Sequence, residues 1–88
     1  MVVRRSPDVV DDEVDGRAVL VDADGRELIT LNPTGTLVWR SIDGVRDRDE
    51  IARLVHEQVE DQVTLEQVER DVRRFVDELV AEGLAVRD

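Results

Sequence analysis

The chain has 88 residues, enough for one domain (residues 1–88) but not for a deep cavity within its core, which favours binding over catalysis. Its 22 acidic residues against twelve arginines give a formal net charge of −10, which opposes nucleic-acid binding because phosphate contacts need a clustered basic surface. The sequence has no cysteine and no run of about 20 apolar residues, which excludes disulfide and thiol chemistry and predicts a cytoplasmic protein with no membrane partner.

The N-terminal part of the sequence predicts an arm and two strands. Residues 1–7 are polar and include Pro7, so we expect a flexible arm there. Residues 8–16 are a weak strand candidate. Residues 17–22 are a stronger candidate, because their run of valine and leucine favours a pleated, half-buried surface.

A hairpin and a third strand follow. Residues 23–26 contain an Asp-Gly pair between two apolar runs, which is a strong short-range hairpin signal. In the return strand, residues 27–31, alternate side chains point to opposite faces, with Ile29 and Leu31 on the same face. The first third of the chain therefore predicts a three-stranded antiparallel sheet.

The rest of the chain predicts three helices, and the first two begin at capping signals. Asn32 followed by Pro33 starts the first helix, which we expect to run to about Ile42. Asp47 and Glu50 have capping-box spacing at the start of the second helix, whose apolar residues recur at helical intervals.

The third helix has the clearest capping box, formed by Thr64 and Gln67, and we expect it to end at Gly83 in a left-handed cap. Its apolar residues fill an arc wider than the roughly 100° that one core face needs, so part of the arc could border a groove. The pattern does not decide which margin of the arc faces the third strand. The arc contains Leu65, Val68, Val72, Phe75, Val76, Leu79 and Val80.

The first helix contains the only tryptophan of the chain, Trp39, one helical turn after a glycine. We interpret Trp39 as a core residue that packs with Val38 and Ile42 against the sheet. Gly35 would let the helix approach a neighbour because no Cβ stands in the way. The alternative is that Trp39 stacks on a ligand.

Residues for catalysis or metal binding are scarce. His56 is the only histidine and lies on a polar helix face, without a second histidine or a cysteine to complete a metal site. Asp22, Asp24 and Gly25 lack the later ligands of a calcium loop, so a hairpin turn is favoured there. No glycine-rich phosphate loop occurs. The sequence predicts no catalytic residue, no metal and no cofactor, and a protein that is not an enzyme.

Four pieces of the sequence, taken together, resemble the PqqD-like family. They are the "LNPTG" that starts a helix, the tryptophan four residues after its glycine, the "DG" that ends this helix, and the late "DVRRFVDELVAEGL". The resemblance runs from about Val19 to Leu84. This family comprises RiPP recognition elements, which bind the leader segments of ribosomally made, post-translationally modified peptides. Its small members include PqqD proteins and the leader-binding proteins of lasso-peptide clusters.

The resemblance implies a winged helix-turn-helix-like α+β fold, with an N-terminal three-stranded antiparallel sheet followed by three helices. It also implies a non-catalytic adaptor, or peptide chaperone, that binds a leader peptide as an added strand on the third strand, beside the third helix. The implied partners are the precursor and a maturation enzyme such as a radical-SAM protein or a leader peptidase. The acidity of this chain and its few aromatic residues depart from the family and leave the leader sequence open.

The residues themselves support a peptide site at the third strand. An edge strand offers unpaired N–H and C=O groups to an extended peptide, unless the edge is solvated or covered by the arm. Apolar side chains of the third helix would select particular leader side chains. The arginines of this helix could meet a leader carboxylate, although pairing with helical acidic neighbours is favoured. The expected peptide-binding residues are Glu27, Leu28, Ile29, Thr30, Leu31, Val68, Val72, Arg73, Phe75 and Val76.

Two further function classes stay open at this point. A winged-helix outline also serves DNA-binding regulators, although the net charge of −10 argues against one here. A generic interaction module, with the edge strand pairing with a second copy, is the other.

Overall fold

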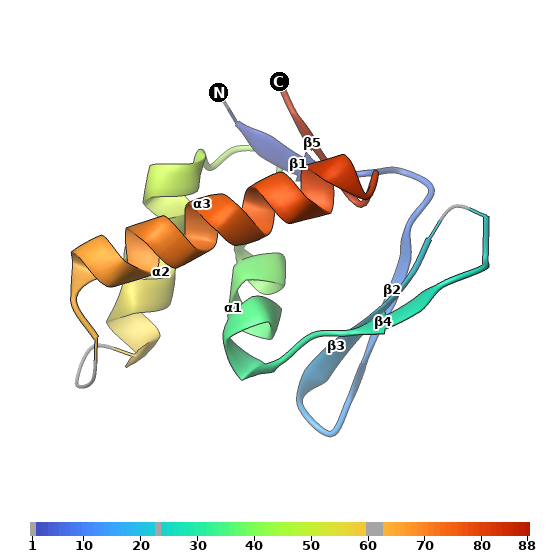
Figure 1. Cartoon of the computed structure of the whole chain (residues 1–88), viewed down its shortest axis with the longest axis horizontal. Coiled ribbons are helices and arrows are strands. Elements are labelled where there is room, and N and C mark those ends of the chain that lie inside the picture. The colour runs from blue at the N-terminus through green and yellow to red at the C-terminus, as the bar shows by residue number, and fades with distance from the viewer. Residues whose placement is uncertain (1, 23, 60–62) are drawn as a thin grey trace.

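The computed structural model describes residues 2–22, 24–59 and 63–88. Within these residues a three-stranded antiparallel sheet, in the order β2-β3-β4, precedes the helices, which confirms the expected α+β arrangement (Figure 1). A second sheet pairs β1 with β5. The elements are β1 (Val3–Arg5), β2 (Val10–Val14), β3 (Arg17–Val21), β4 (Leu28–Thr30), α1 (Pro33–Ser41), α2 (Arg48–Val59), α3 (Leu65–Ala81) and β5 (Ala85–Arg87).

Two tight turns build the three-stranded sheet around the central strand β3. The β2–β3 turn passes through Asp15 and Gly16, whose φ angles of 53° and 79° are the left-handed values that short hairpins require. In the β3–β4 turn Gly25 has a φ of 68°, and its amide donates to the carbonyl of Asp22 at 3.0 Å. The predicted Asp-Gly hairpin is therefore confirmed, except that Ala23 lies outside the described residues.

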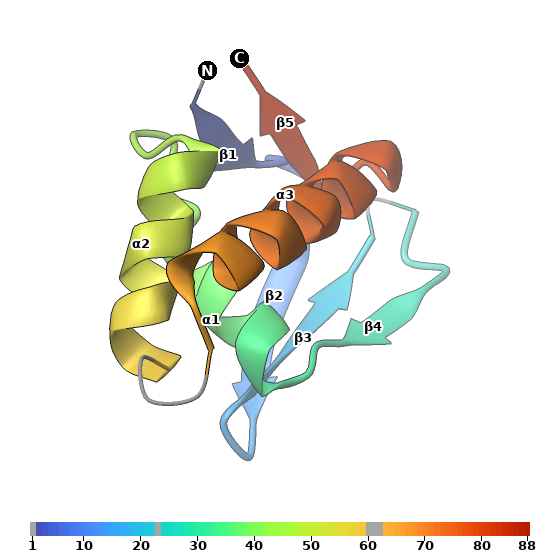
Figure 2. The same ribbon diagram turned by 60° about the vertical axis from the view of Figure 1, so that its left-hand side comes forward.

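All three helices lie on one side of this sheet, as Figures 1 and 2 show. The side chains of Ala18 and Leu20 on β3 point to that side and are buried. Thr36 of α1 is also buried, and its hydroxyl accepts the amide of Ala18 at 2.9 Å. We call the side of the sheet that faces the helices the inner face.

The expectation of a flexible arm at residues 1–7 is wrong for residues 3–5, which form β1. Val3 is fully buried, and its backbone bonds with the loop after α1: its amide donates to Arg46 and its carbonyl accepts from Gly44. On the other side, β1 pairs with β5 at the opposite end of the chain. A strand of three residues with one buried side chain has almost no periodic signal, and its partners lie far away in sequence.

The predicted helix caps are confirmed. The side chain of Asn32 accepts the amide of Gly35 at 2.7 Å, with Pro33 at the first helical position. Thr64 and Gln67 form the reciprocal capping box of α3. Gly83, with a φ of 75°, ends that helix in the left-handed conformation.

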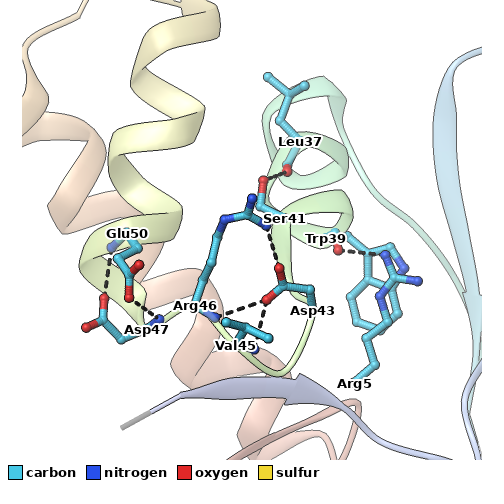
Figure 3. A network of polar contacts seen from close by, with 9 residues as sticks. All are labelled: Arg5, Leu37, Trp39, Ser41, Asp43, Val45, Arg46, Asp47 and Glu50. Carbon is cyan, nitrogen blue, oxygen red and sulfur yellow. Dashed lines mark hydrogen bonds and ion pairs between the residues drawn. The ribbon is translucent and has the colours of Figure 1, made fainter.

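A second reciprocal box fixes the loop before α2, which Figure 3 shows beside the end of α1. Asp47 and Glu50 exchange side-chain to amide hydrogen bonds, as their spacing predicts. Asp43 accepts the amides of Arg46 and Val45, and these two hydrogen bonds lower the pKa of its carboxyl group. The loop that receives Val3 is thus held by its own side chains.

Trp39 and Gly35 both serve packing, as the sequence predicts. Trp39 is only 2% exposed, and its indole Nε1 donates to Asp11 of β2 at 3.0 Å. The guanidinium of Arg5 lies 4.7 Å from the ring centroid and donates to the Trp39 carbonyl, as drawn in Figure 3. A Cβ on Gly35 would lie 3.2 Å from the ring of Phe75, so this glycine lets α1 approach α3 closely.

Candidate functional site

The backbone of β4 has one side paired with β3 and one side open. The amide of Asp22 donates to the Glu27 carbonyl at 3.3 Å, and the amide of Leu31 donates to the Ala18 carbonyl at 2.8 Å. Hydrogen-bonded pairs alternate along an antiparallel ladder, so Ile29 also faces β3. The amides and carbonyls of Leu28 and Thr30 consequently point away from the sheet.

The side chains of β4 leave this open edge accessible. None of its three residues is charged, and Leu28 is 70% exposed. Ile29 points to the inner face and packs against the core, while Thr30 is exposed with Leu28 on the opposite face. This confirms the alternation predicted for the strand. An uncharged edge with free backbone groups is the arrangement to which an extended peptide can add.

The other edge of the same sheet, β2, is different. It carries Asp11, Asp12 and Glu13 in succession. By the same alternation the amides of Asp11 and Glu13 point outward, and the Glu13 amide is already bonded to the Asp12 carboxylate at 2.8 Å. Charged side chains are a common protection of sheet edges against strand addition.

The side chains of β2 also tie this edge to α1. Asp11 accepts from the Trp39 indole, and Glu13 accepts from the Nε and Nη2 atoms of Arg40. The hydrogen bond from Arg40 lowers the pKa of the Glu13 carboxyl group. Of the two edges of the sheet, β4 is therefore the better candidate for strand addition.

A groove of about 680 Å³ lies where β4 leads into α1. It runs between the start of α1, the end of α2 and one side of α3, and Asn32 and Gly35 border it directly after the strand. Three charged residues of α3 lie along it, Asp71, Arg74 and Glu78. The apolar residues that line it are Val38, Val59, Val63, Val68, Val72 and Phe75.

The structure brings some of the expected site residues together. Phe75 is half-buried and lines the groove, and its ring lies beside Gly35, which the buried Leu31 also borders. Val68 and Val72 line the same groove, although little of either side chain is exposed. The margin of α3 that contains Val68 and Phe75 is therefore the one that faces the β4–α1 junction.

Two expected residues lie elsewhere on α3. Val76 is fully buried in the core. Arg73 lies towards α2, where its guanidinium is 3.4 Å from Asp49, and it also pairs with Glu69. Arg74, one residue later, borders the groove instead and pairs with Asp71 at 3.6 Å. Both arginines thus pair with acidic residues of their own helix, as the sequence predicts.

Sequence reasoning missed the residues of α1 and α2 that line the groove. It also missed the three charged residues of α3 along it, Asp71, Arg74 and Glu78. These charged residues have a signal in the sequence, because Asp71, Arg74 and Glu78 recur at helical spacing on one face of α3. The α1 and α2 residues carry no such signal, since only tertiary packing brings Val38 and the end of α2 to one place.

Neither a metal-ligand cluster nor a membrane-spanning helix occurs among the described residues. Residues 2–22, 24–59 and 63–88 contain no group of three or more His, Cys, Asp or Glu side chains placed to hold a metal ion. The helices in that part of the chain are too short or too polar to cross a bilayer. His56 lies at the end of α2, with its Nε2 atom 3.2 Å from the Val63 carbonyl.

Comparison with known proteins places this geometry in context. The family model described as coenzyme PQQ synthesis protein D (PqqD) matches residues 17–85. No curated protein matches the chain. A solved structure of TbiB1 in complex with the TbiA(beta) leader peptide is similar, with 25% identity and a TM-score of 0.79, over 97% of this chain and 99% of that one. A lasso peptide synthetase B1 complexed with the leader peptide has 24% identity and a TM-score of 0.82, over 99% of this chain and 100% of that one.

Proposed function

This chain belongs to the PqqD family, and from that premise we propose that it is an adaptor that binds the leader segment of a ribosomally made precursor peptide and delivers it to a maturation enzyme. In this role the chain binds and presents a peptide and carries out no chemistry itself. We infer that the leader adds as a fourth strand to β4, beside the groove along α3.

The observation that carries this proposal is the open edge of β4 next to an apolar groove. Leu28 and Thr30 each direct one amide and one carbonyl outward, so a guest strand gains main-chain hydrogen bonds with little demand on its sequence. Phe75 and its apolar neighbours in the groove would then select particular leader side chains. The structural match to TbiB1 covers nearly the whole of this chain, and TbiB1 was solved in complex with a leader peptide. This match supports a peptide as the ligand.

The proposal also covers the type of biosynthetic pathway and, with it, the partner enzyme. We propose a lasso-peptide pathway, in which the partner enzyme would be a leader peptidase, because the chain shares its fold with a lasso peptide synthetase B1. A radical-SAM protein is the corresponding partner if the pathway instead resembles that of coenzyme PQQ. In both pathways the adaptor works in the cytoplasm, where ribosomes release the precursor.

Titration of the purified chain with synthetic peptides tests the adaptor role. The leader half of the precursor that this chain serves is expected to bind with a Kd near 1 μM, or about −8 kcal/mol, and the core half should not bind. The matched control is a scrambled leader of the same composition. Absence of saturable leader binding, both alone and with the partner enzyme present, would overturn the proposed function.

A further inference from the structure

The face of the sheet that points away from the helices carries a row of exposed and partly exposed apolar side chains. Val10, Val21 and Leu28 are direct partners across β2, β3 and β4, and side chains of partnered residues share one face. Val14 and Val19 belong to the same face by alternation. Asp12 and Arg17 lie on this side as well, as the partners of Val19 and Val14. We call the five apolar residues of this side the outer face: Val10, Val14, Val19, Val21 and Leu28.

The outer face is open to solvent. Val10, Val14 and Leu28 are 65%, 57% and 70% exposed, respectively, whereas Ala18 and Leu20 on the inner face are buried. Figures 1 and 2 show the helices on the inner side of the sheet. Contiguous exposed apolar side chains surrounded by polar residues are typical of protein–protein contact sites.

Acidic residues surround this apolar row. Residues 8–27, which contain β2, β3 and both turns, include eight acidic residues and two arginines, for a formal net charge of −6. Of these, Asp11 and Glu13 point to the inner face, where they contact Trp39 and Arg40. Asp15 lies in the turn at one end of the sheet, and Asp22, Asp24 and Glu27 lie in the turn at the other end. Such a rim repels a second copy of this chain and favours a partner whose own rim is basic.

We propose that the outer face docks the maturation enzyme through a surface of that enzyme that is apolar at its centre and rich in Arg or Lys around it. This inference rests on the proposed function. Leu28 connects the two sites, because its backbone belongs to the open edge and its side chain to the outer face. An enzyme docked there would lie directly beside a leader strand on β4.

The test uses the full chain, a synthetic leader and the purified maturation enzyme of the same pathway. The double variant Val10→Thr/Val14→Thr keeps the shape and strand preference of valine but makes the face polar. We expect its affinity for the enzyme to fall about tenfold or more, by biolayer interferometry, while its leader affinity stays within about twofold. Raising the salt concentration should weaken docking of the unaltered chain, because a basic rim meets an acidic one.

Val45→Thr is the matched control, because Val45 is 73% exposed but lies in the loop before α2. It should change neither affinity. Unaltered enzyme binding by the double variant, or no enzyme binding by the original chain, would overturn this inference, and leader binding in the same samples reports separately on the adaptor role. If sedimentation shows a dimer of the original chain that the double variant loses, the occupant is a second copy and the inference is wrong.

Discussion

The two outer strands of the three-stranded sheet pair with the same central strand but present opposite edges. β2 has three acidic residues in succession, and the Asp12 carboxylate occupies the outward amide of Glu13. β4 has no charged residue, and the amides of Leu28 and Thr30 point outward. The backbone pattern is equivalent on both sides, so the side chains decide which edge can accept a guest strand.

The surroundings of the two edges reinforce this difference. Asp11 and Glu13 use their carboxylates to hold β2 against Trp39 and Arg40 of α1. The end of β4 leads instead into the groove that Phe75 lines. The same sheet therefore uses one edge for stability and, in our proposal, the other for recognition.

The largest expected effect comes from proline at the inward position of β4. Ile29→Pro removes an amide that faces β3 and displaces a side chain that packs on the core. We expect a loss of about 2–4 kcal/mol in the free energy of unfolding, from the lost hydrogen bond and the unpaired carbonyl left on Leu20. Circular dichroism melting measures it. A variant as stable as the original chain would show that the alternation deduced for this strand is wrong.

Proline at an outward position should separate binding from folding. Thr30→Pro is expected to leave the melting temperature nearly unchanged but to weaken leader binding about 30-fold, or about 2 kcal/mol, because an outward amide is lost and the ring stands in the guest strand's path. Leu28→Pro should behave in the same way. Thr30→Val is the control, since it keeps both the amide and the shape of the side chain. Unchanged leader affinity in both proline variants would place the guest on another edge.

Removal of the aromatic ring in the groove tests the side-chain part of recognition. Phe75→Ala should weaken leader binding about tenfold and destabilise the half-buried site by about 1.5–2.5 kcal/mol, roughly half the cost at a fully buried position. Val80→Ala, at a partly buried position of α3 outside the groove, is the control for general destabilisation. Isothermal titration calorimetry of the leader should distinguish the two variants, and equal affinities would remove Phe75 from the binding site.

The smallest expected effect is a dependence of the stability on pH that arises from Glu13 on β2. The Arg40 hydrogen bond lowers the pKa of Glu13, so this pair stabilises the folded chain above the usual pKa of a glutamate and loses that contribution as the pH falls through the lowered value. Both side chains are exposed, so the effect is small. We expect the melting temperature of Glu13→Gln to fall slightly less than that of the original chain between pH 5 and pH 3. A steeper fall in the variant would contradict this assignment.

Local features of the fold could be predicted because they depend on neighbours in sequence. The caps at Asn32 and Thr64, the Asp-Gly hairpin and the two faces of β4 all follow from residues within a few positions of one another. The pairing of Val3 with the end of the chain could not, because it depends on a contact between residues more than 80 positions apart.

The site was predictable to a similar extent. Alternation assigns the side chains of β4 to faces, but the direction of the Thr30 amide depends on which side of the strand β3 lies. A helical wheel shows that the apolar arc of α3 is wide, but only the packing of α1 reveals that Phe75 borders the groove and that Arg73 turns towards α2. The expected peptide-binding residues stay a prediction until a leader is titrated.

The pairing of β1 with β5 determines where a second domain would start if it were joined to either end of the chain. Both ends of the described chain leave the fold together, and Figure 2 shows them across α3 from β4. A second domain tethered at either end would start from the same place without covering the open edge. A flexible tether of about 40 residues spans roughly 35 Å on average, close to the 37 Å longest dimension of the molecule. Such a fusion would hold a bound peptide at a high effective concentration near its tethered partner, whichever end carried it.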